Sequence, residues 1–307
     1  MKDTWQGVCS RSGTTAACSP RSVWEGLSMT RLQRCLPALA LFLVLPLPAI
    51  AQGLVDVVVA GNELRAGISL PGGIGADLTI GFEQVAGLTP QNLGVSASLV
   101  NITDPNLLGR LGSGSLLSAF PVLLRIEPPA DGGLAFHGVA SISLHTHNLD
   151  YVPGTLFRIF AAPLGGRFED ITASVGHGSY RCRGSKGSFS EFLILADLRP
   201  VRMVVAEKLD RVDRILVDNA GSIDGGVLHD LTSLAGDIRS AWAAGQSQQA
   251  IAKTDAFLEI VRNNSGTAIP DIWRSSRDVV NVAGLLRAAG ETLRFSLGLK
   301  SNLLGLL

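Results

Sequence analysis

The sequence is short of cysteine in the part of the chain that is expected to fold. It holds four cysteines, and three of them (Cys9, Cys18 and Cys35) precede residue 52, where we place the start of the mature chain. The remaining Cys182 has no second cysteine in the mature chain to pair with. An internal disulfide framework is therefore excluded, and stability must come from a hydrophobic core. We expect Cys182 to be a small buried side chain, with a disulfide to another chain as the alternative.

An excess of charge of one sign is also absent. The 26 Lys and Arg residues balance the 26 Asp and Glu residues, and loss of the first 51 residues leaves a slightly acidic chain. A protein that binds nucleic acid or an acidic membrane surface ordinarily carries a basic surplus. The composition therefore argues against both partners.

The chain lacks an uninterrupted apolar run of membrane-spanning length. The segment Cys35–Ala51 falls short of the about 20 residues that a spanning helix needs, and three prolines interrupt it. Arg31 and Arg34 precede it, and small residues end it at Ala49–Ala51. This is the pattern of a secretory signal peptide at residues 29–51, cleaved before Gln52. An uncleaved anchor is the alternative, and we interpret residues 1–28 as a disordered, misassigned start.

Motifs for enzyme chemistry are missing as well. No serine lies in a G-x-S-x-G nucleophile elbow, and neither Gly72–Gly75 nor Gly112–Gly114 continues into a lysine-containing phosphate loop. His177 has no partner base or acid that the sequence identifies. Acidic residues are scattered through the chain. Hydrolysis therefore remains open only through groups that meet in space, either a pair of carboxylates or a serine beside His177.

Residues 52–205 show the period of strands rather than helices. Short apolar runs, several of them alternating with polar residues, are separated by turn residues. We predict an antiparallel β-sandwich, immunoglobulin-like or similar. The principal strands are expected at Val55–Val59, Glu63–Ile68, Ala76–Phe82, Val95–Val100, Pro121–Ile126, Phe136–His145, Leu156–Ala161, Ile171–Val175, Gly178–Arg183 and Phe189–Leu195.

Two details of this strand pattern are specific. Phe189–Leu198 alternates little, as in a strand that is buried on both faces at the centre of a sheet. The period of two places Tyr180 and Cys182 on one face, which we expect to be inside, and the two neighbouring arginines outside.

Residues 206–307 show the period of amphipathic helices. About four helices with short connections are expected, which predicts an antiparallel helical bundle. Pro270 suits the first turn of the last helix, which would include Ile272 and Trp273. The apolar tail Leu297–Leu307 either closes the bundle or contacts a membrane or partner. The sequence thus predicts an α+β protein of two domains.

The helical part resembles the FIMAH domain of exported bacterial proteins. The similarity lies in Gly221-Ser222-Ile223, Ala244-Gly245 and Phe257–Val261 and covers about 208–289. The resemblance implies an accessory, non-catalytic helical module. The segment from Phe168 to Phe192 is similar to an uncharacterised family of exported bacterial proteins, which implies no activity.

Two groups of residues have the chemistry of metal ligands. His145 and His147 stand two apart in a strand, so they point to one side, and Asp150 follows; together they offer ligands for zinc. A solvated histidine pair is the interpretation that we favour, so no cofactor is predicted, and zinc is the alternative. Asn101, Thr103, Asp104 and Asn106 form an oxygen-rich turn of the kind that calcium prefers, although an ordinary turn uses the same residues.

From these patterns we expect an exported protein of the periplasm, cell surface or medium. A non-enzymatic binding or structural role with a cell-envelope component or another protein as partner is favoured. A hydrolase acting on glycan or ester substrates is the alternative. The ligand and the oligomeric state are not specified by the sequence.

Overall fold

The computed structural model describes residues 53–303, with side chains through residue 299. The predicted signal peptide, the segment before it, the first three cysteines and the end of the apolar tail lie outside the described residues. Among the helices that are described, none is long and apolar enough to cross a membrane.

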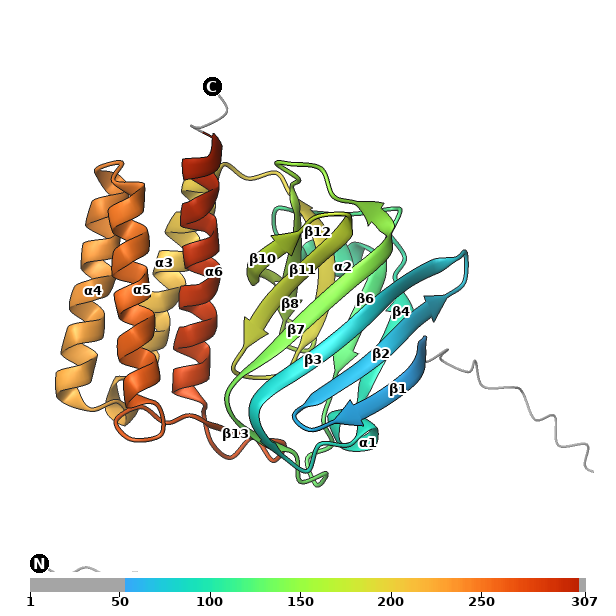
Figure 1. The fold of residues 1–307 in the computed structure, drawn as a ribbon, viewed down its shortest axis with the longest axis horizontal. Coiled ribbons are helices and arrows are strands. Elements are labelled where there is room, and N and C mark those ends of the chain that lie inside the picture. Colours follow the sequence, from blue (N-terminus) through green and yellow to red (C-terminus); the bar gives the residue numbers. More distant parts are fainter. Residues whose placement is uncertain (1–52, 304–307) are drawn as a thin grey trace, which may run out of the picture. The chain divides into compact units, whose positions relative to one another are not determined.

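Most of the strands form two antiparallel sheets (Figure 1). In sheet A the strands follow the order β1-β2-β3-β7-β11-β10, and the short strand β13 pairs with β7 beyond the end of β11. Its strands are β1 (Leu54–Ala60), β2 (Glu63–Leu70), β3 (Ile74–Ala86), β7 (Ala135–Asp150), β10 (Thr172–Gly176), β11 (Ser179–Lys186) and β13 (Ile272–Arg274).

Sheet B has the order β4-β6-β12-β8-β9, and β5 pairs with β12. Its strands are β4 (Val95–Leu99), β5 (Gly114–Leu116), β6 (Val122–Ile126), β8 (Phe157–Ala162), β9 (Glu169–Asp170) and β12 (Glu191–Asp197).

One face of sheet A and one face of sheet B share a hydrophobic cluster. Leu78 and Ile142 contribute to it from sheet A, and Leu124 and Ile194 contribute from sheet B. The strands of sheet A alternate buried apolar residues with outward-facing polar residues, as expected for a sheet with one covered face. The α+β class that the sequence predicts is confirmed.

Both specific strand predictions are also confirmed. Strand β12 lies between β6 and β8 at the centre of sheet B, and all but one of its residues are buried. Tyr180 and Cys182 are buried, and the neighbouring Arg181 and Arg183 are exposed. Burial raises the pKa of the Cys182 thiol to about 12, so this cysteine behaves as an inert hydrophobic side chain.

Four long helices follow sheet B in the chain, after two short helices within the strand region. Valine and leucine residues from all four share a second hydrophobic cluster, separate from that of the sheets. The helices are α1 (Pro90–Leu93), α2 (Pro105–Arg110), α3 (Val201–Asp218), α4 (Gly225–Ala243), α5 (Ser247–Asn264) and α6 (Val282–Leu303), with the 3-10 turn η1 (Ala220–Ser222) between α3 and α4.

The predicted start of the last helix is wrong. Ile272 and Trp273 form strand β13, and α6 begins only at Val282. Trp273 is buried and stacks on Phe136 of β7, with ring centroids 5.2 Å apart. Its apolar side chain therefore belongs to the sheet core, and Pro270 precedes a strand rather than opening a helix. Strand β13 thus returns the chain from the helices to sheet A.

Helix α6 packs closely against one end of the outer face of sheet A. The contact depends on glycine: a Cβ on Gly187 would lie 2.6 Å from the backbone carbon of Gly284. Polar pairs flank this contact, because Ser185 donates to Glu291 at 2.6 Å and Arg287 pairs with Glu83.

A buried ion pair fastens the helices to sheet B. The Nζ atom of Lys208 on α3 lies 2.6 Å from Asp170 of β9 and also donates to Thr292 and Ser296 of α6. Burial raises the pKa of the Asp170 carboxyl, but the Lys208 ammonium and hydrogen bonds from Thr172 outweigh burial, so this pKa lies below its usual value. The same burial lowers the pKa of the Lys208 ammonium, and Asp170 opposes this shift. We take the pair as ionised, because Nζ donates to several oxygen atoms at once.

Candidate metal centre on sheet A

Strand β7 presents His145 and His147 on the outer face of sheet A. Their neighbours Leu144 and Thr146 are buried in the opposite direction, and the Thr146 hydroxyl donates to the Tyr180 carbonyl at 3.1 Å. The two imidazole rings lie side by side, with centroids 5.5 Å apart. The predicted orientation of the histidine pair is therefore what the structure shows.

The third member of the group comes from the neighbouring strand. Asp77 of β3 stands directly opposite His145 in the antiparallel register. Its Oδ2 atom lies 3.0 Å from His145 Nδ1 and 3.2 Å from His147 Nε2. One carboxylate oxygen thus contacts both rings, and the three potential ligand atoms all lie within 4.8 Å of one another.

Asp150, the third ligand that the sequence predicts, is not brought into this group. It lies at the end of β7, opposite Ser179 of β11, and is exposed. The physical reason is an irregularity in the pairing of β7 with β11 between His145 and Asp150, where Leu149 turns into the core. Asp150 is three residues from His147, whereas the cross-strand position of Asp77 places its carboxylate on the same face as both histidines.

Asp77 is held in its ionised form. The hydrogen bond from His147 lowers the pKa of the Asp77 carboxyl, with His145 acting in the same direction and burial opposing both. The side chains of Asp77 and His147 are 60% and 51% exposed, whereas His145 is 28% exposed. An ion from solvent therefore has direct access to the group.

The turn between β2 and β3 is fixed beside the histidines. Asn148 of β7 donates to the Gly73 carbonyl at 3.1 Å and accepts from the Gly75 N–H at 2.8 Å. A Cβ on Gly75 would lie 3.0 Å from His147 Nδ1, so the glycine leaves room for the ring. We interpret Gly72–Gly75 as a loop from the sequence, but only Gly72 and Gly73 lie in the turn, whereas Ile74 and Gly75 begin β3.

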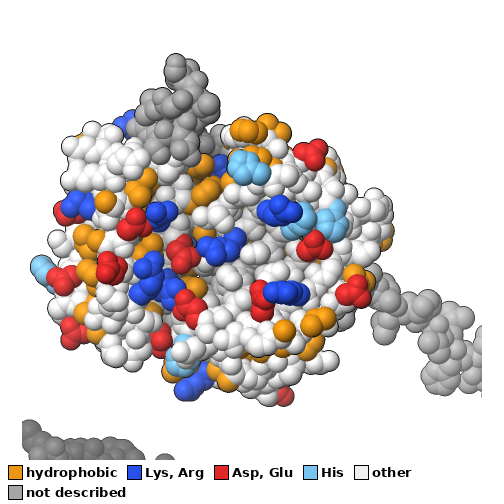
Figure 2. Space-filling view, viewed as in Figure 1, with side chains coloured by type: hydrophobic (Ala, Val, Ile, Leu, Met, Phe, Trp, Pro, Cys, Tyr) orange, Lys and Arg blue, Asp and Glu red, His pale blue; other side chains and the backbone are white. Residues whose placement is uncertain are grey.

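The second ring nitrogen of His145 is left without a partner. Its Nε2 atom is buried, and no hydrogen bond to it is present among the described residues. Such an unpaired buried group costs about 1–3 kcal/mol. An open depression adjoins this ring, lined by Arg181, Ser143 and Ser174 among others. Figure 2 shows histidine side chains gathered on this face of sheet A, with acidic and basic side chains beside them.

The predicted calcium ligands serve ordinary roles of a turn and a helix cap. Asn101 accepts from the backbone and the hydroxyl of Thr103, at 2.9 and 2.7 Å. Asp104 caps α2 by accepting from the Asn106 N–H at 2.9 Å. The local interactions therefore account for these oxygen atoms.

One candidate acid for hydrolysis, Glu191, is held by cations. Glu191 is buried between Arg110 and Arg125, with 2.7 Å to Arg125. Burial raises the pKa of Glu191, but the two guanidinium groups outweigh it and keep the pKa below its usual value. A general acid needs the opposite shift. His177 contacts Tyr151 edge to face, with ring centroids 4.5 Å apart.

Asp77 is not among the metal ligands that the sequence predicts. The alternation in Ala76–Phe82 does place its side chain outward, but nothing in the sequence gives the register that brings β3 opposite His145. The sequence does show an acidic residue on the outward face of this strand. Several other predicted strands also carry such a residue, so the pattern does not single out Asp77.

The described part of the chain is thus an α+β protein with an Asp–His–His group on the exposed face of one sheet. The chain matches the family model DUF6689, described as a family of unknown function, over residues 39–300, and so belongs to that family. The match spans both the strand-rich and the helical region. Neither a characterised protein nor a solved structure matches the chain.

Proposed function

We propose that this protein is an exported, non-enzymatic binding protein that holds a divalent transition-metal ion, zinc, on the outer face of sheet A. The ligands are Asp77, His145 and His147. The observation that carries the proposal is the convergence of one carboxylate oxygen and two imidazole nitrogens within 4.8 Å.

The two distances from Asp77 suit zinc. Ligand atoms about 2.0–2.1 Å from a tetrahedral zinc ion are about 3.3–3.4 Å apart. The observed distances from Asp77 Oδ2 to His145 Nδ1 and to His147 Nε2 are 3.0 and 3.2 Å. The two imidazole nitrogens lie within 4.8 Å of each other, and both strands are already fixed by the sheet.

The donor set favours zinc over calcium. Calcium takes six to eight oxygen ligands, whereas imidazole nitrogen with one carboxylate is a zinc or copper set. Three protein ligands leave the fourth position of a tetrahedral ion free for water or for a ligand from a partner. That open position is where a cell-envelope component would bind.

A non-enzymatic role is supported by the state of the acidic groups. Asp170 and Glu191 are paired with Lys208 and with arginines and have lowered pKa values, so neither supplies a proton at neutral pH. Hydrolysis of glycan or ester substrates remains the alternative. A metal-dependent hydrolytic activity that disappears in His145→Ala would favour it.

The proposal also includes the division of the chain into two domains. We infer that residues 52–205 form a β-sandwich and residues 206–307 an antiparallel helical bundle of the FIMAH-like kind. The cluster shared by the two sheets and the separate cluster shared by α3–α6 support this division. Export through a signal peptide at 29–51 is tested by mass spectrometry of the native protein, for which we expect Gln52 as the first residue.

Calorimetric titration of the purified protein with zinc chloride tests the metal site. We expect one ion per chain for the wild type, and loss of binding in Asp77→Ala, His145→Ala and His147→Ala. His229→Ala is the matched control, because His229 is exposed on α4, away from the group. Absence of binding to the wild type, or equal loss in the control, would overturn the proposal.

A further inference from the structure

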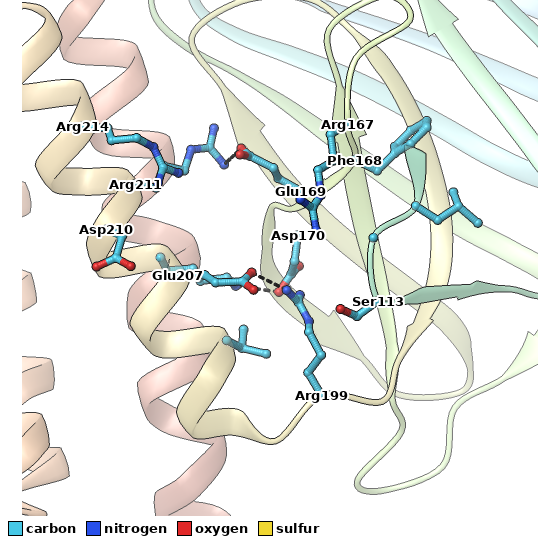
Figure 3. A pocket seen from close by; sticks show the side chains of 14 residues that line it. Ser113, Arg167, Phe168, Glu169, Asp170, Arg199, Glu207, Asp210, Arg211 and Arg214 are labelled. Carbon is cyan, nitrogen blue, oxygen red and sulfur yellow. Dashed lines mark hydrogen bonds and ion pairs between the residues drawn. The ribbon is translucent and has the colours of Figure 1, made fainter. Parts of the chain in front are cut away.

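A second pocket lies on the other side of the molecule, between α3 and the ends of sheet B (Figure 3). One wall is a face of α3 that carries Arg211 and Arg214. The facing wall is formed by the loop before β9, with Arg167, and by Ser113 after α2. Its volume is about 260 Å³, below the about 300–1,000 Å³ of sites for drug-sized ligands. The pocket therefore suits a small ligand.

The acidic side chains of this pocket are all engaged. Each lies within ion-pair distance of a cation, although Arg199 is shared with Asp197 and Arg239 with Asp213, two carboxylates outside the lining. The pairs are Asp170 with Lys208 at 2.6 Å, Glu169 with Arg211 at 3.1 Å, Asp210 with Arg239 at 3.0 Å, and Glu207 with Arg199.

Two of the pocket's arginines remain without an acidic partner. Arg167 and Arg214 are exposed, and among the described residues no ion pair or hydrogen bond is made by either guanidinium. They belong to opposite walls, and Arg211 extends from α3 beside Arg214 (Figure 3). The pocket thus presents two guanidinium groups without an ion pair next to a third guanidinium, and its lining carries five cationic and four acidic side chains.

We propose that this pocket binds a tetrahedral dianion, phosphate, either as the free ion or as the terminal group of a phosphomonoester. Two guanidinium groups that make no ion pair among the described residues are available to a ligand with two negative charges. Guanidinium groups bind phosphate through paired N–H donors, which is why arginine is the usual residue at such sites. The Ser113 hydroxyl on the facing wall supplies one more donor.

A buried lysine lies near Arg211. Lys186 is 6% exposed, and its ammonium is repelled by Arg211 and attracted by Glu169. Burial, assisted by the Arg211 guanidinium, lowers the pKa of Lys186 to about 7. An anion held by Arg211 would relieve this repulsion.

Calorimetric titration with sodium phosphate at low ionic strength tests the inference, with glucose 6-phosphate as the monoester. We expect binding to the wild type and a loss of affinity of about tenfold or more in Arg167→Gln and in Arg214→Gln. Arg202→Gln is the matched control, because Arg202 is exposed on the same helix and does not line the pocket. Binding of the monoester alone identifies the ester as the ligand.

Three results would overturn the inference. The first is the absence of binding of both compounds to the wild type, and the second is an equal loss of affinity in Arg202→Gln. The third is equal binding of acetate, because a carboxylate carries one charge and is not tetrahedral. The result is independent of the metal site, since Asp77→Ala is expected to leave phosphate binding unchanged.

Discussion

The outer face of sheet A has two ends that differ in what covers them. At one end α6 lies on the strands, and Ser185 pairs with Glu291 and Glu83 with Arg287, whose Nε atom is buried without a partner. At the other end His145, His147 and Asp77 face solvent, and one ring nitrogen of His145 has no partner. Strand β3 supplies a carboxylate to each end, Glu83 to the first and Asp77 to the second. Cover by a helix thus separates polar groups that stabilise the fold from polar groups that are free to bind a ligand.

We expect substitutions at the contacts between the helices and the sheets to change the free energy of unfolding most. The largest effect is expected for Asp170→Ala, which leaves Lys208 buried without its counter-ion. Breaking a buried pair in this way costs about 3–5 kcal/mol in the free energy of unfolding, measured by urea denaturation.

The control is Asp210→Ala, because Asp210 and Arg239 form an exposed pair worth about 0–1 kcal/mol. The sign with pH follows from the lowered pKa of Asp170: its stabilisation is present above the unfolded-state value and is lost as pH falls through the folded-state value. If Asp170→Ala were as mild as the control, the ion pair would not fasten the helices to the sheet.

Lys186→Met is expected to stabilise the protein. Replacing a buried, poorly compensated charge with an apolar side chain of similar size raises the free energy of unfolding by about 1–4 kcal/mol. The pKa of about 7 lies below the unfolded-state value, so the burial penalty is full below pH 7 and declines as pH rises above it. Urea denaturation at pH 6 and pH 9 should therefore show a larger gain at pH 6, and a gain independent of pH would contradict this assignment.

Gly284→Ala tests the close approach of α6 to sheet A. A Cβ at this position overlaps the Gly138 carbonyl oxygen, and overpacking of this kind costs about 1–3 kcal/mol. Gly236→Ala in α4 is the matched control, because nothing lies within 4 Å of its Cβ. The control should gain about 0.5–1 kcal/mol from the helix propensity of alanine. If thermal denaturation showed that Gly284→Ala stabilises the protein as Gly236→Ala does, the contact of α6 with sheet A would be loose.

The smallest effect is expected at the open end of sheet A. His147→Ala without metal should change the free energy of unfolding by less than about 0.5 kcal/mol, since the side chain is half exposed. With zinc at 100 times its dissociation constant, only the wild type should gain about 2.7 kcal/mol. A large loss in the metal-free variant would mean that the histidines are structural.

Local patterns in the sequence predict much of this fold. The period of two identifies most strands, and the unbroken apolar run at Phe189–Leu198 correctly places β12 at the centre of sheet B. The helical period identifies α3, α4 and α5. These features depend on which residues along one short segment are apolar, and the sequence shows this directly.

Features that depend on pairing between distant segments were not predictable. Ile272 and Trp273 fit a helical spacing, yet tertiary contact with Phe136 makes them part of a strand. The metal group needs Asp77 opposite His145, and the phosphate pocket needs Arg167 opposite α3. Register and the packing of helices on sheets decide both sites, and the order of residues alone does not specify either.

The most direct test of the central claim is X-ray absorption spectroscopy of the zinc-loaded protein. We expect a four-coordinate ion with two imidazole ligands, one carboxylate and one water, at Zn–N distances of about 2.0–2.1 Å. In His145→Ala the imidazole signal should be lost together with stoichiometric zinc. A spectrum with sulfur ligation, or one that is unchanged in this variant, would contradict the assignment of Asp77, His145 and His147 as the ligands.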